Sequence, residues 1–522
     1  MKSTTIGIES SAFDVKSSTI DIESTTIDVK STTIDIESTT IDIKSTTIDI
    51  ESSAFDVKTS TIISIYPTCA AFMCLFFLTL RRSCTLLLLF WAGALSLTST
   101  TAQTDEGSSD YRRDNRLRYY DYVYSPNIQT PRFIITGLAL SNPVIDLTGG
   151  TILELSFDDI SDDFHDYSYK IIHCNADWQP SALGELEYID GYVSDRITNY
   201  HNSSRASTKY MHYSLSFPNE NTRITKSGNY LIKVYEGSDE DKLVLTRRFL
   251  VVEPKMRVLG TLGLTAAPSK LRTHQELDFI VDYKGTNLTD YSREIKTVVM
   301  QNFRWDNAIR GLQPVFQREN QLVYDFQDVV VFGGGKEFRR LDLTSVRYNT
   351  EHVRTVAEED DHHYHVYLYD DYDRSTYTYD NQPDANGRTA IALKDSDQPD
   401  LEGDYVFVHF TFPSPQDLPD GDLYIFGALT DWKCAPANRL RYNEKLHRYE
   451  CTLRLKQGFH NYIYAYVPHK AETIDTERYE GNWFETENDY NVLVYYRPFG
   501  ERYDRLVAVQ TFNSFTANNT RR

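Results

Sequence analysis

The sequence predicts an all-β protein in which tandem Ig-like or early-set β-sandwich domains flank a middle β domain. The first reason is composition: 37 Tyr and 26 Phe stand against 5 Met, and aromatic side chains suit pleated, half-buried surfaces. The second is a series of short alternating runs after residue 125, such as TILELSF at 151–157, separated by Gly, Asn, Asp or Pro. The third is that no long stretch repeats its apolar residues with the helical period of about 3.6.

The first hundred residues do not share this pattern. Residues 1–72 are a low-complexity repeat of 14 residues, which is either translated upstream of the true start or disordered. From Met73 to residue 103, two arginines, a short apolar run and small residues follow in the order of a secretory signal peptide. The apolar run is shorter than the roughly 20 residues of a membrane-spanning helix. Met73 is therefore interpreted as the start, and Gln103 as close to the mature N-terminus.

A charged, tyrosine-rich leader at 104–125 precedes the first predicted domain, which covers residues 126–254. In the phrase KSGNYLIKV, Tyr230 follows Gly228 by two residues. This spacing is typical of the tyrosine corner of immunoglobulin-like sandwiches, in which the ring caps one end of the core. The pattern predicts an Ig-like domain with Tyr230 largely buried.

Residues 255–400 form the second predicted block, a middle β domain with an acidic loop. Residues 401–510 form the third, followed by a tail at 511–522. In the third block, FGALTDWK and the later run YECTLRLKQGFHNYIYAYV resemble the early-set β-sandwich of glycogen-binding modules. Trp432 and Trp483 are therefore candidates for stacking on a glycan. The structural alternative is that Trp432 closes the end of the sandwich.

Motifs that would indicate catalysis or metal binding are incomplete. The segment FGGGK at 332–336 lacks the spacer and the trailing Ser or Thr of a phosphate-binding loop, which favours a hairpin turn. The aspartates around Asp158 favour a solvated loop over a calcium site. His362, His363 and His365 lack the spacing of helical metal ligands. With no nucleophile elbow either, the sequence predicts no enzyme, no catalytic residue, no metal and no cofactor.

Charge and cysteine content set further bounds. The formal net charge is −21, and such an acidic surface repels nucleic acid and anionic headgroups. Of the six cysteines, three lie in or near the targeting segment. Cys434 and Cys451 can form a disulfide in an oxidising compartment or remain buried thiols, and the sequence leaves both alternatives open.

Several long phrases resemble one known family. They are IIHCNADWQPSALGELEYIDGYVSDRITNY at 171–200, VVMQNFRWDNAIRGLQPVF at 298–316 and DGDLYIFGALTDWK at 420–433, together with the tyrosine-rich strands around them. These phrases resemble the type IX secretion system plug protein family of Bacteroidota, long catalogued as a domain of unknown function. The resemblance spans roughly residues 115–510 and leaves out the N-terminal repeat.

The resemblance implies a non-enzymatic plug that seals the periplasmic mouth of a large outer-membrane translocon barrel of the SprA/Sov type when that barrel is idle. Wide barrels enclose an aqueous channel that would otherwise leak. It also implies a periplasmic location at the inner face of the outer membrane, held there through the partner. An alternative from another class is a carbohydrate-binding accessory protein acting through the C-terminal sandwich. A third is a hydrolase with an unrecognised site.

A releasable seal is expected to use a broad, mostly polar contact, with binding energy concentrated in Trp, Tyr and Arg. Two loop-like phrases, DWQP and RWDN, contain such residues, and loops at the ends of sandwiches often carry function. We therefore predict that Trp178, Arg304 and Trp305 lie in or near the partner interface. The alternative is that these tryptophans only close sandwich cores.

Overall fold

The computed structural model describes residues 28–29, 35–36, 116–161, 163–359, 362–470 and 473–519. The chain divides into two units, Met1–Gly107 and Ser108–Arg522. In the first unit, β1 (Asp28–Val29) pairs antiparallel with β2 (Asp35–Ile36). The rest of the repeat and the predicted signal peptide at 73–103 lie outside the described residues. Within the described part, none of the helices combines the length and apolar character needed to cross a bilayer.

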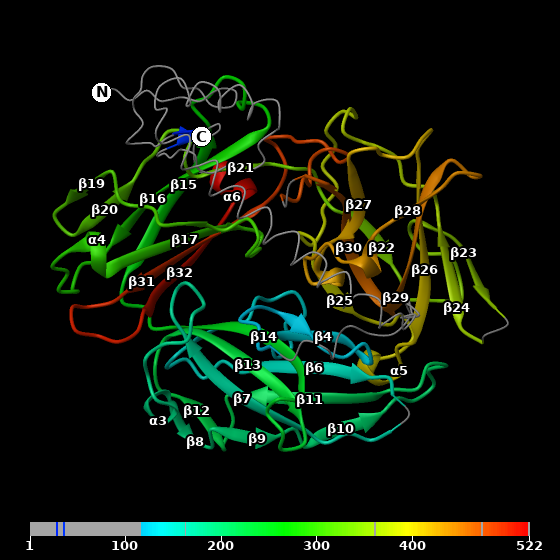
Figure 1. Cartoon of the computed structure of the whole chain (residues 1–522), viewed down its shortest axis with the longest axis horizontal. Helices are drawn as coiled ribbons and strands as arrows, with labels where there is room; N and C mark the ends of the chain where they lie inside the picture. Colours follow the sequence, from blue (N-terminus) through cyan, green and yellow to red (C-terminus); the bar gives the residue numbers. More distant parts are fainter. Residues whose placement is uncertain are drawn as a thin grey trace, which may run out of the picture. The chain divides into compact units, whose positions relative to one another are not determined.

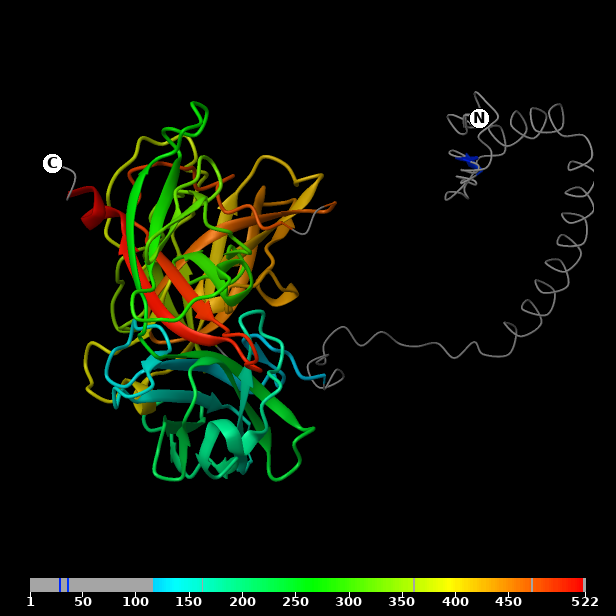
Figure 2. The ribbon, with the colours of Figure 1, turned by 90° about the vertical axis from the view of Figure 1, so that its left-hand side faces the viewer.

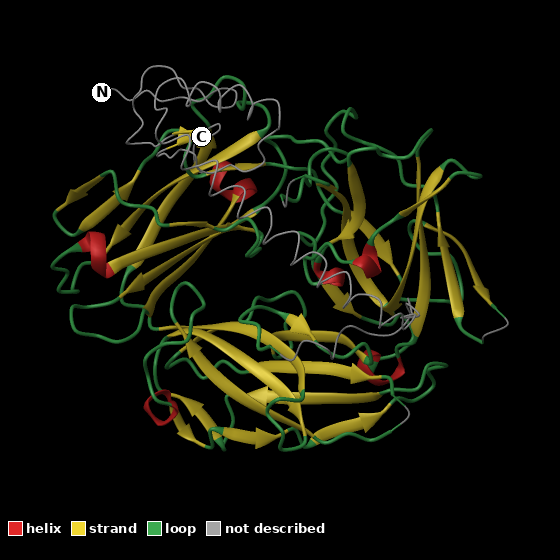
Figure 3. Ribbon diagram, viewed as in Figure 1, coloured by secondary structure: helices red, strands yellow, loops and turns green. Residues whose placement is uncertain are grey.

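The second unit is nearly all β, which confirms the predicted fold class (Figure 3). Its strands form mainly antiparallel sheets, with two parallel pairings, and the sheets pack into a first, a middle and a third sandwich. The α-helices are single turns or little more: α3 (Glu185–Tyr188), α4 (Tyr291–Glu294), α5 (Pro399–Glu402) and α6 (Ser514–Asn519).

The first sandwich packs two main sheets over a core of Ile, Leu, Val, Phe and Tyr side chains. One sheet has the order β10-β11-β6-β4, with β10 (Asn199–Asn202), β11 (Met211–Phe217), β6 (Leu153–Asp159) and β4 (Ile128–Ile135). The other has the order β3-β14-β13-β7-β9, with β3 (Tyr122–Val123), β14 (Leu243–Val252), β13 (Gly228–Glu236), β7 (Tyr167–Cys174) and β9 (Ser194–Arg196), and β5 (Val144–Asp146) also pairs with β14. A small ribbon joins β8 (Ile189–Gly191) to β12 (Thr222–Ile224).

Tyr230 lies in β13 with no exposed surface, as the sequence predicts. Its hydroxyl donates to the carbonyl of Lys226 at 2.8 Å, and its ring stacks on Phe249 with centroids 5.2 Å apart. A tyrosine hydroxyl bonded to the backbone a few residues upstream is the arrangement of a tyrosine corner. The ring therefore fixes the entry of β13 into the core.

The middle sandwich is built from strands far apart in the sequence. One sheet has the order β15-β16-β20-β19, with β15 (Arg257–Leu264), β16 (His274–Asp282), β20 (Gln321–Tyr324) and β19 (Phe316–Arg318), and β21 (Val331–Gly333) also pairs with β16. The other has the order β18-β17-β31-β32, with β18 (Ile309–Arg310), β17 (Ile295–Gln301), β31 (Asp489–Tyr496) and β32 (Arg505–Asn513). The red strands near the C-terminus thus run beside the green strands of the middle sandwich (Figure 2).

This pairing differs from the predicted block boundaries. The sequence pattern places residues 489–510 in the third block, but β31 pairs with β17 along Ile295↔Tyr496 to Gln301↔Tyr490. Residues 339–391, predicted as part of the middle block, supply β22 to β25 of the third sandwich. The third sandwich is therefore inserted between two parts of the middle one. A local sequence pattern shows where a strand lies. It does not show which other strand will pair with it, because that depends on the packing of the whole sheet.

The third sandwich has one sheet in the order β23-β24-β26-β29-β28, with β23 (Val353–Glu358), β24 (Tyr364–Leu368), β26 (Tyr405–Pro413), β29 (Arg448–Lys456) and β28 (Arg441–Asn443). Against it lies β30 (Gly458–Pro468), which pairs with β22 (Arg339–Asp342), β25 (Thr389–Ile391) and β27 (Gly421–Phe426) (Figure 1). Short 3-10 turns follow β27, at Ala428–Thr430 and Pro436–Asn438. Their loops carry side chains toward the other sandwiches.

Candidate functional site

Two tryptophans from different sandwiches meet edge to face. Trp178 lies in the loop after β7 and is 5% exposed, and Trp305 lies in the loop after β17 and is half-buried. Their ring centroids are 5.1 Å apart and the planes cross at 88°. This is the favoured edge-to-face arrangement, which contributes about 0.5–1.5 kcal/mol beyond the burial of area. The two residues singled out from separate loop phrases thus contact each other.

A cation from β14 joins both rings. The Arg248 guanidinium carbon lies 5.1 Å from the Trp178 ring centroid and 5.0 Å from that of Trp305. The same side chain pairs with Asp121 at 3.3 Å, and the Arg248 backbone N–H donates to Asp121 at 2.6 Å. Burial alone would raise the pKa of Asp121, but Arg248, Arg247 and Lys433 together lower it. No sequence pattern points to Arg248, because it sits mid-strand with no motif around it.

Arg304 links the middle sandwich to the third. Its guanidinium makes a two-point contact with Asp306, at 2.6 and 3.2 Å. It also faces the rings of Phe426 and Trp432, with 5.0 and 5.2 Å from its guanidinium carbon to the centroids. Arg304 is buried, and a cation on an aromatic face is attractive. The predicted interface residue Arg304 thus contacts the predicted glycan-stacking residue Trp432.

An ion pair and a hydrogen bond complete the junction between the first and third sandwiches. Arg247 of β14 pairs with Asp431 at 3.0 Å. The Lys433 ammonium donates to the backbone carbonyl of Asp121. Eight side chains make up this contact region, which we call the Trp–Arg junction: Trp178, Arg247, Arg248, Arg304, Trp305, Asp431, Trp432 and Lys433.

A second buried contact joins the first and third sandwiches at Asp158. The Lys456 ammonium lies 2.5 Å from one Asp158 oxygen, and both side chains are 1% exposed. The Tyr405 hydroxyl donates to the same oxygen at 2.6 Å, and His212 Nδ1 lies 2.6 Å from the other. Burial would raise the pKa of Asp158, but His212 and Lys456 lower it. The predicted solvated loop around Asp158 is therefore wrong for this residue, whose partner on β29 is 298 residues away.

A cleft of about 530 Å³ lies where the middle sandwich meets the third. Arg304, Asp306 and Glu477 are among the residues that line it. The glycines of the FGGGK segment also line it. A Cβ on Gly334 would lie 1.9 Å from the Trp483 carbonyl oxygen, so this glycine allows two backbone segments to touch. The amide side chains of Gln301 and Asn488 donate to the carbonyls of Gly333 and Gly334, at 2.7 and 2.8 Å.

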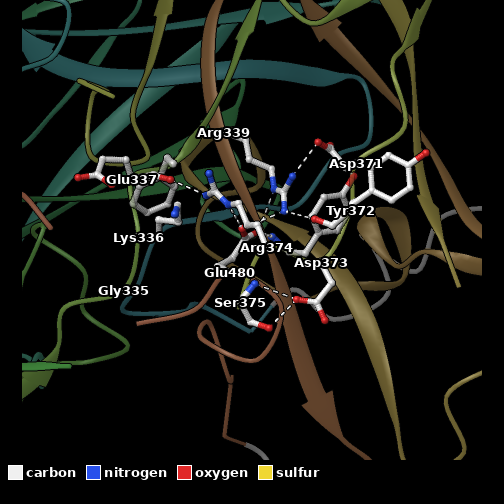
Figure 4. Close-up of polar contacts among 12 residues, drawn as sticks. Gly335, Lys336, Glu337, Arg339, Asp371, Tyr372, Asp373, Arg374, Ser375 and Glu480 are labelled. Carbon is white, nitrogen blue, oxygen red and sulfur yellow. Dashed lines mark hydrogen bonds and ion pairs between the residues drawn. The ribbon is translucent and has the colours of Figure 1, made fainter. Parts of the chain in front are cut away.

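A buried network of charges supports the segment beside this cleft (Figure 4). Arg339 pairs with Asp371 at 2.8 Å and with Glu480 at 3.0 Å, and Arg374 pairs with Glu480 at 2.5 Å. Burial would raise the pKa of Asp371, but Arg339 and His352 lower it. The Arg374 guanidinium also donates to the Glu337 carbonyl at 2.5 Å. The network therefore holds the backbone at Glu337 and the side chain of Glu480 in fixed positions relative to each other.

Trp432 and Trp483 each have a cation on the ring. The Lys336 ammonium lies 4.3 Å from the Trp483 centroid, and Arg304 lies over Trp432. Phe338 and Phe426 also meet Trp432 edge to face, at 5.9 and 5.5 Å. Stacking on a sugar needs a free ring face beside polar partners. The ring faces that carry these cations are not open to a sugar.

In the part of the chain that the structure describes, the candidate reactive and metal-ligating side chains do not gather in one cluster. Among the described residues, no group of three or more His, Cys, Asp or Glu could hold a metal ion. His365 Nδ1 lies 2.9 Å from His409 Nε2, while the His362 side chain is exposed. Cys434 and Cys451 are free thiols, and burial raises the pKa of each to about 12. A thiol with so high a pKa is a poor nucleophile.

Comparisons with known proteins point to one family. A family model described as the type 9 secretion system plug protein 1st domain matches residues 128–253, the span of the first sandwich. A crystal structure of a hypothetical protein from Parabacteroides merdae ATCC 43184 aligns with a TM-score of 0.73 at 35% sequence identity. That alignment covers 76% of this chain and 100% of the other. Among curated proteins, none matches at a significant level.

Proposed function

The chain belongs to the type IX secretion system plug protein family, and from this premise we propose that it is a non-enzymatic plug. It seals the periplasmic mouth of the large outer-membrane translocon barrel of that system while no cargo is engaged. The observation that carries the proposal is the match of the family model to residues 128–253. The hypothetical protein from Parabacteroides merdae, which aligns over its full length, shares the fold.

A plug has to keep its shape while it covers a wide opening, and the contacts between the sandwiches favour this. The Asp158–Lys456 pair and the Trp–Arg junction bury charge and aromatic area between the sandwiches. Removing one partner of such a buried pair costs about 3–5 kcal/mol, so separating the sandwiches is unfavourable. The second unit is therefore expected to act as one body.

Attachment through a protein partner is favoured over direct attachment to lipid. The formal net charge is −21 for the full sequence and stays strongly negative without residues 1–103, so the exported protein repels anionic headgroups. The proposed location is the periplasm, at the inner face of the outer membrane, after removal of the signal peptide at 73–103. Sequencing the N-terminus of the periplasmic protein tests this: it is expected near Gln103, and a mature chain that keeps the repeat would contradict it.

Trp178, Arg304 and Trp305 stay in the proposal as residues in or near the contact with the barrel. Trp178 is 5% and Arg304 7% exposed, so neither offers much area of its own. In this proposal they hold the half-buried Trp305 and its loop in position, and the loop surface makes the contact. Binding energy in protein interfaces is concentrated in a few well-packed aromatic and Arg residues, and a Trp305 loop held in place by Trp178 and Arg304 would supply such a site.

Deleting the gene tests the proposed function. Cells without the protein are expected to admit a large antibiotic that intact outer membranes exclude, while the translocon barrel is still assembled. Returning the gene should restore exclusion, and the purified barrel should carry the protein. The proposal is abandoned if the deletion admits no more antibiotic and the barrel never carries the chain.

A further inference from the structure

The tyrosine-rich leader that precedes the first sandwich packs where that sandwich meets the middle one. We call its described residues 116–124 the strap. Strap residues Leu117 and Tyr119 pack against a buried cluster to which both sandwiches contribute. This cluster includes Cys174 of the first sandwich and Met300 of the middle one, neither of which has exposed surface. The strap thus covers apolar side chains of two sandwiches at once.

Backbone hydrogen bonds place the strap along the edge of β14. Its strand β3 pairs with β14 at Thr246↔Tyr122 and Leu245↔Val123. The Thr246 hydroxyl also donates to the Tyr120 carbonyl at 2.7 Å. A ladder of two residues is shorter than almost all strands of globular proteins, so the position of the strap depends on further contacts.

Asp121 of the strap makes contacts with both the first and the third sandwich. Its carboxylate accepts from the Arg248 backbone N–H at 2.6 Å and pairs with the Arg248 guanidinium at 3.3 Å. From the third sandwich, the Lys433 ammonium donates to the Asp121 carbonyl and lies 5.2 Å from the Tyr122 ring centroid. One strap residue therefore bonds to a cation of each sandwich.

Three cations lie around two carboxylates in this part of the Trp–Arg junction. The cations are Arg247 and Arg248 of β14 and Lys433 of the third sandwich. The carboxylates are Asp121 of the strap and Asp431 of the third sandwich. Burial lowers the pKa of Lys433 and its arginine neighbours lower it further, whereas the two carboxylates raise it. Like charges repel strongly where water is largely excluded. Without Asp121, the three cations would share one carboxylate.

We propose that the strap locks the first sandwich to the third at the Trp–Arg junction, with the Asp121 carboxylate as the shared counter-ion. While the strap is in place, Asp121 offsets the repulsion between the β14 arginines and Lys433. When the strap is displaced, the two sandwiches repel at this point and the cluster around Cys174 opens to solvent. The Asp158–Lys456 contact still joins them, so the junction opens without separating the sandwiches. The inference goes beyond the proposed function, and its test needs no barrel.

The test follows the alkylation of two native thiols by iodoacetamide in the full exported chain, resolved by peptide mass spectrometry. Cys174 lies in the cluster that the strap covers, and Cys451 lies in the core of the third sandwich. Asp121→Asn keeps the size of the side chain and removes its charge. It is expected to speed the labelling of Cys174 about tenfold, between the effects of losing an exposed and a buried ion pair. The labelling of Cys451 should not change.

The control is Asp190→Asn in the same sandwich. Asp190 pairs with Arg223 at the surface, where both side chains are 59% exposed. This variant should leave the labelling of Cys174 unchanged, because an exposed pair is screened by water. Equal acceleration in both variants would overturn the inference, and so would unchanged labelling of Cys174 in Asp121→Asn.

A second substitution separates charge from packing. Adding Lys433→Met to Asp121→Asn removes one of the unbalanced cations, so the labelling of Cys174 should slow again. If the strap acted through packing alone, this change would remove a further contact, and labelling as fast as in Asp121→Asn or faster overturns the inference. Labelling of Cys451 at the rate of Cys174 would mean that Asp121→Asn has unfolded the chain. The double variant then decides: recovered protection of Cys451 supports the inference, and continued labelling overturns it.

Discussion

At the scale of the residue, the contact between Asp158 and Lys456 shows how much depends on one pair. Both side chains are nearly inaccessible to water, and each comes from a different sandwich. Lys456→Met would keep the volume of the side chain and leave the Asp158 carboxylate buried without its cation. We expect the free energy of unfolding to fall by about 3–5 kcal/mol, measured by urea denaturation.

The control for this variant lies in a contact between the same two sandwiches. Arg205 pairs with Glu402 at 2.8 Å, but the Arg205 side chain is 73% exposed. Arg205→Met should cost less than about 1 kcal/mol, because an exposed pair is screened by water. Equal losses for the two variants would contradict the role given to burial.

His460 gives the protein a pH dependence whose sign can be worked out. Burial lowers its pKa from 6.5 to about 4, although its contact with the Lys456 carbonyl opposes this. Between these values the unfolded chain binds a proton that the folded chain does not. Stability is therefore complete above about pH 6.5 and is lost as the pH falls to about 4, by about 3 kcal/mol for this residue.

His460→Gln is expected to reduce, without abolishing, the dependence of unfolding free energy on pH between 6.5 and 4, because burial also lowers the pKa of His173 to about 4. His447 is exposed, so His447→Gln should leave the slope as it is. Denaturation at several pH values measures both. An unchanged slope in His460→Gln would show that other groups set the acid response.

What could be predicted at this scale depended on distance along the chain. Tyr230 could be placed in the core because Gly228, two residues earlier, and the Lys226 carbonyl, four residues earlier, define its corner locally. Asp158 could not, because its environment comes from β29. Trp178 and Trp305 were singled out as candidate interface residues, but Arg248, whose guanidinium lies over both rings, was not, since it is an ordinary strand residue in sequence terms.

At the scale of the element, the glycine segment between β21 and β22 shows a packing constraint. Gly334→Ala would place a methyl group 1.9 Å from the Trp483 carbonyl oxygen. Forcing atoms into a filled space costs about 1–3 kcal/mol, so the melting temperature should fall. The control is Gly184→Ala, because Gly184 has a φ of −74° and a Cβ there would make only an ordinary contact.

If Gly334→Ala and Gly184→Ala have the same melting temperature, the close approach of Gly334 to Trp483 does not limit stability. The sequence alone favoured a turn at this segment and gave no sign of its packing partner. The reason is physical: the partner, at Trp483, belongs to a loop that the third sandwich places there. Strand runs such as YNVLVYY were recognised, but their pairing with β17 was not.

At the scale of the whole molecule, the Trp–Arg junction is expected to hold the middle and third sandwiches together. Arg304→Met keeps the methylene packing on Trp432 and removes the guanidinium. A cation on an aromatic face contributes about 0.5–2 kcal/mol. We therefore expect faster cleavage by a protease between the sandwiches, with the sheets themselves still formed by circular dichroism.

The matched variant is Arg478→Met. Its guanidinium carbon lies 3.9 Å from the Tyr466 ring centroid, so it makes the same kind of contact but inside the third sandwich. It should leave the pattern of cleavage between sandwiches unchanged. Identical cleavage patterns for the two variants would show that Arg304 does not hold the middle and third sandwiches together.

The insertion of the third sandwich into the middle one affects how the protein is made. The chain leaves the ribosome from its N-terminus, so β17 is synthesised long before β31, its neighbour in the sheet. Until then β17 lacks the partner that buries it, and pairings over such long separations form slowly. Until β31 pairs with β17, the apolar surface of the incomplete sandwich is exposed, and the nascent chain is prone to aggregate. A stop codon that removes only the last two strands would thus leave the central sandwich unfinished, although nearly all of the protein had been synthesised.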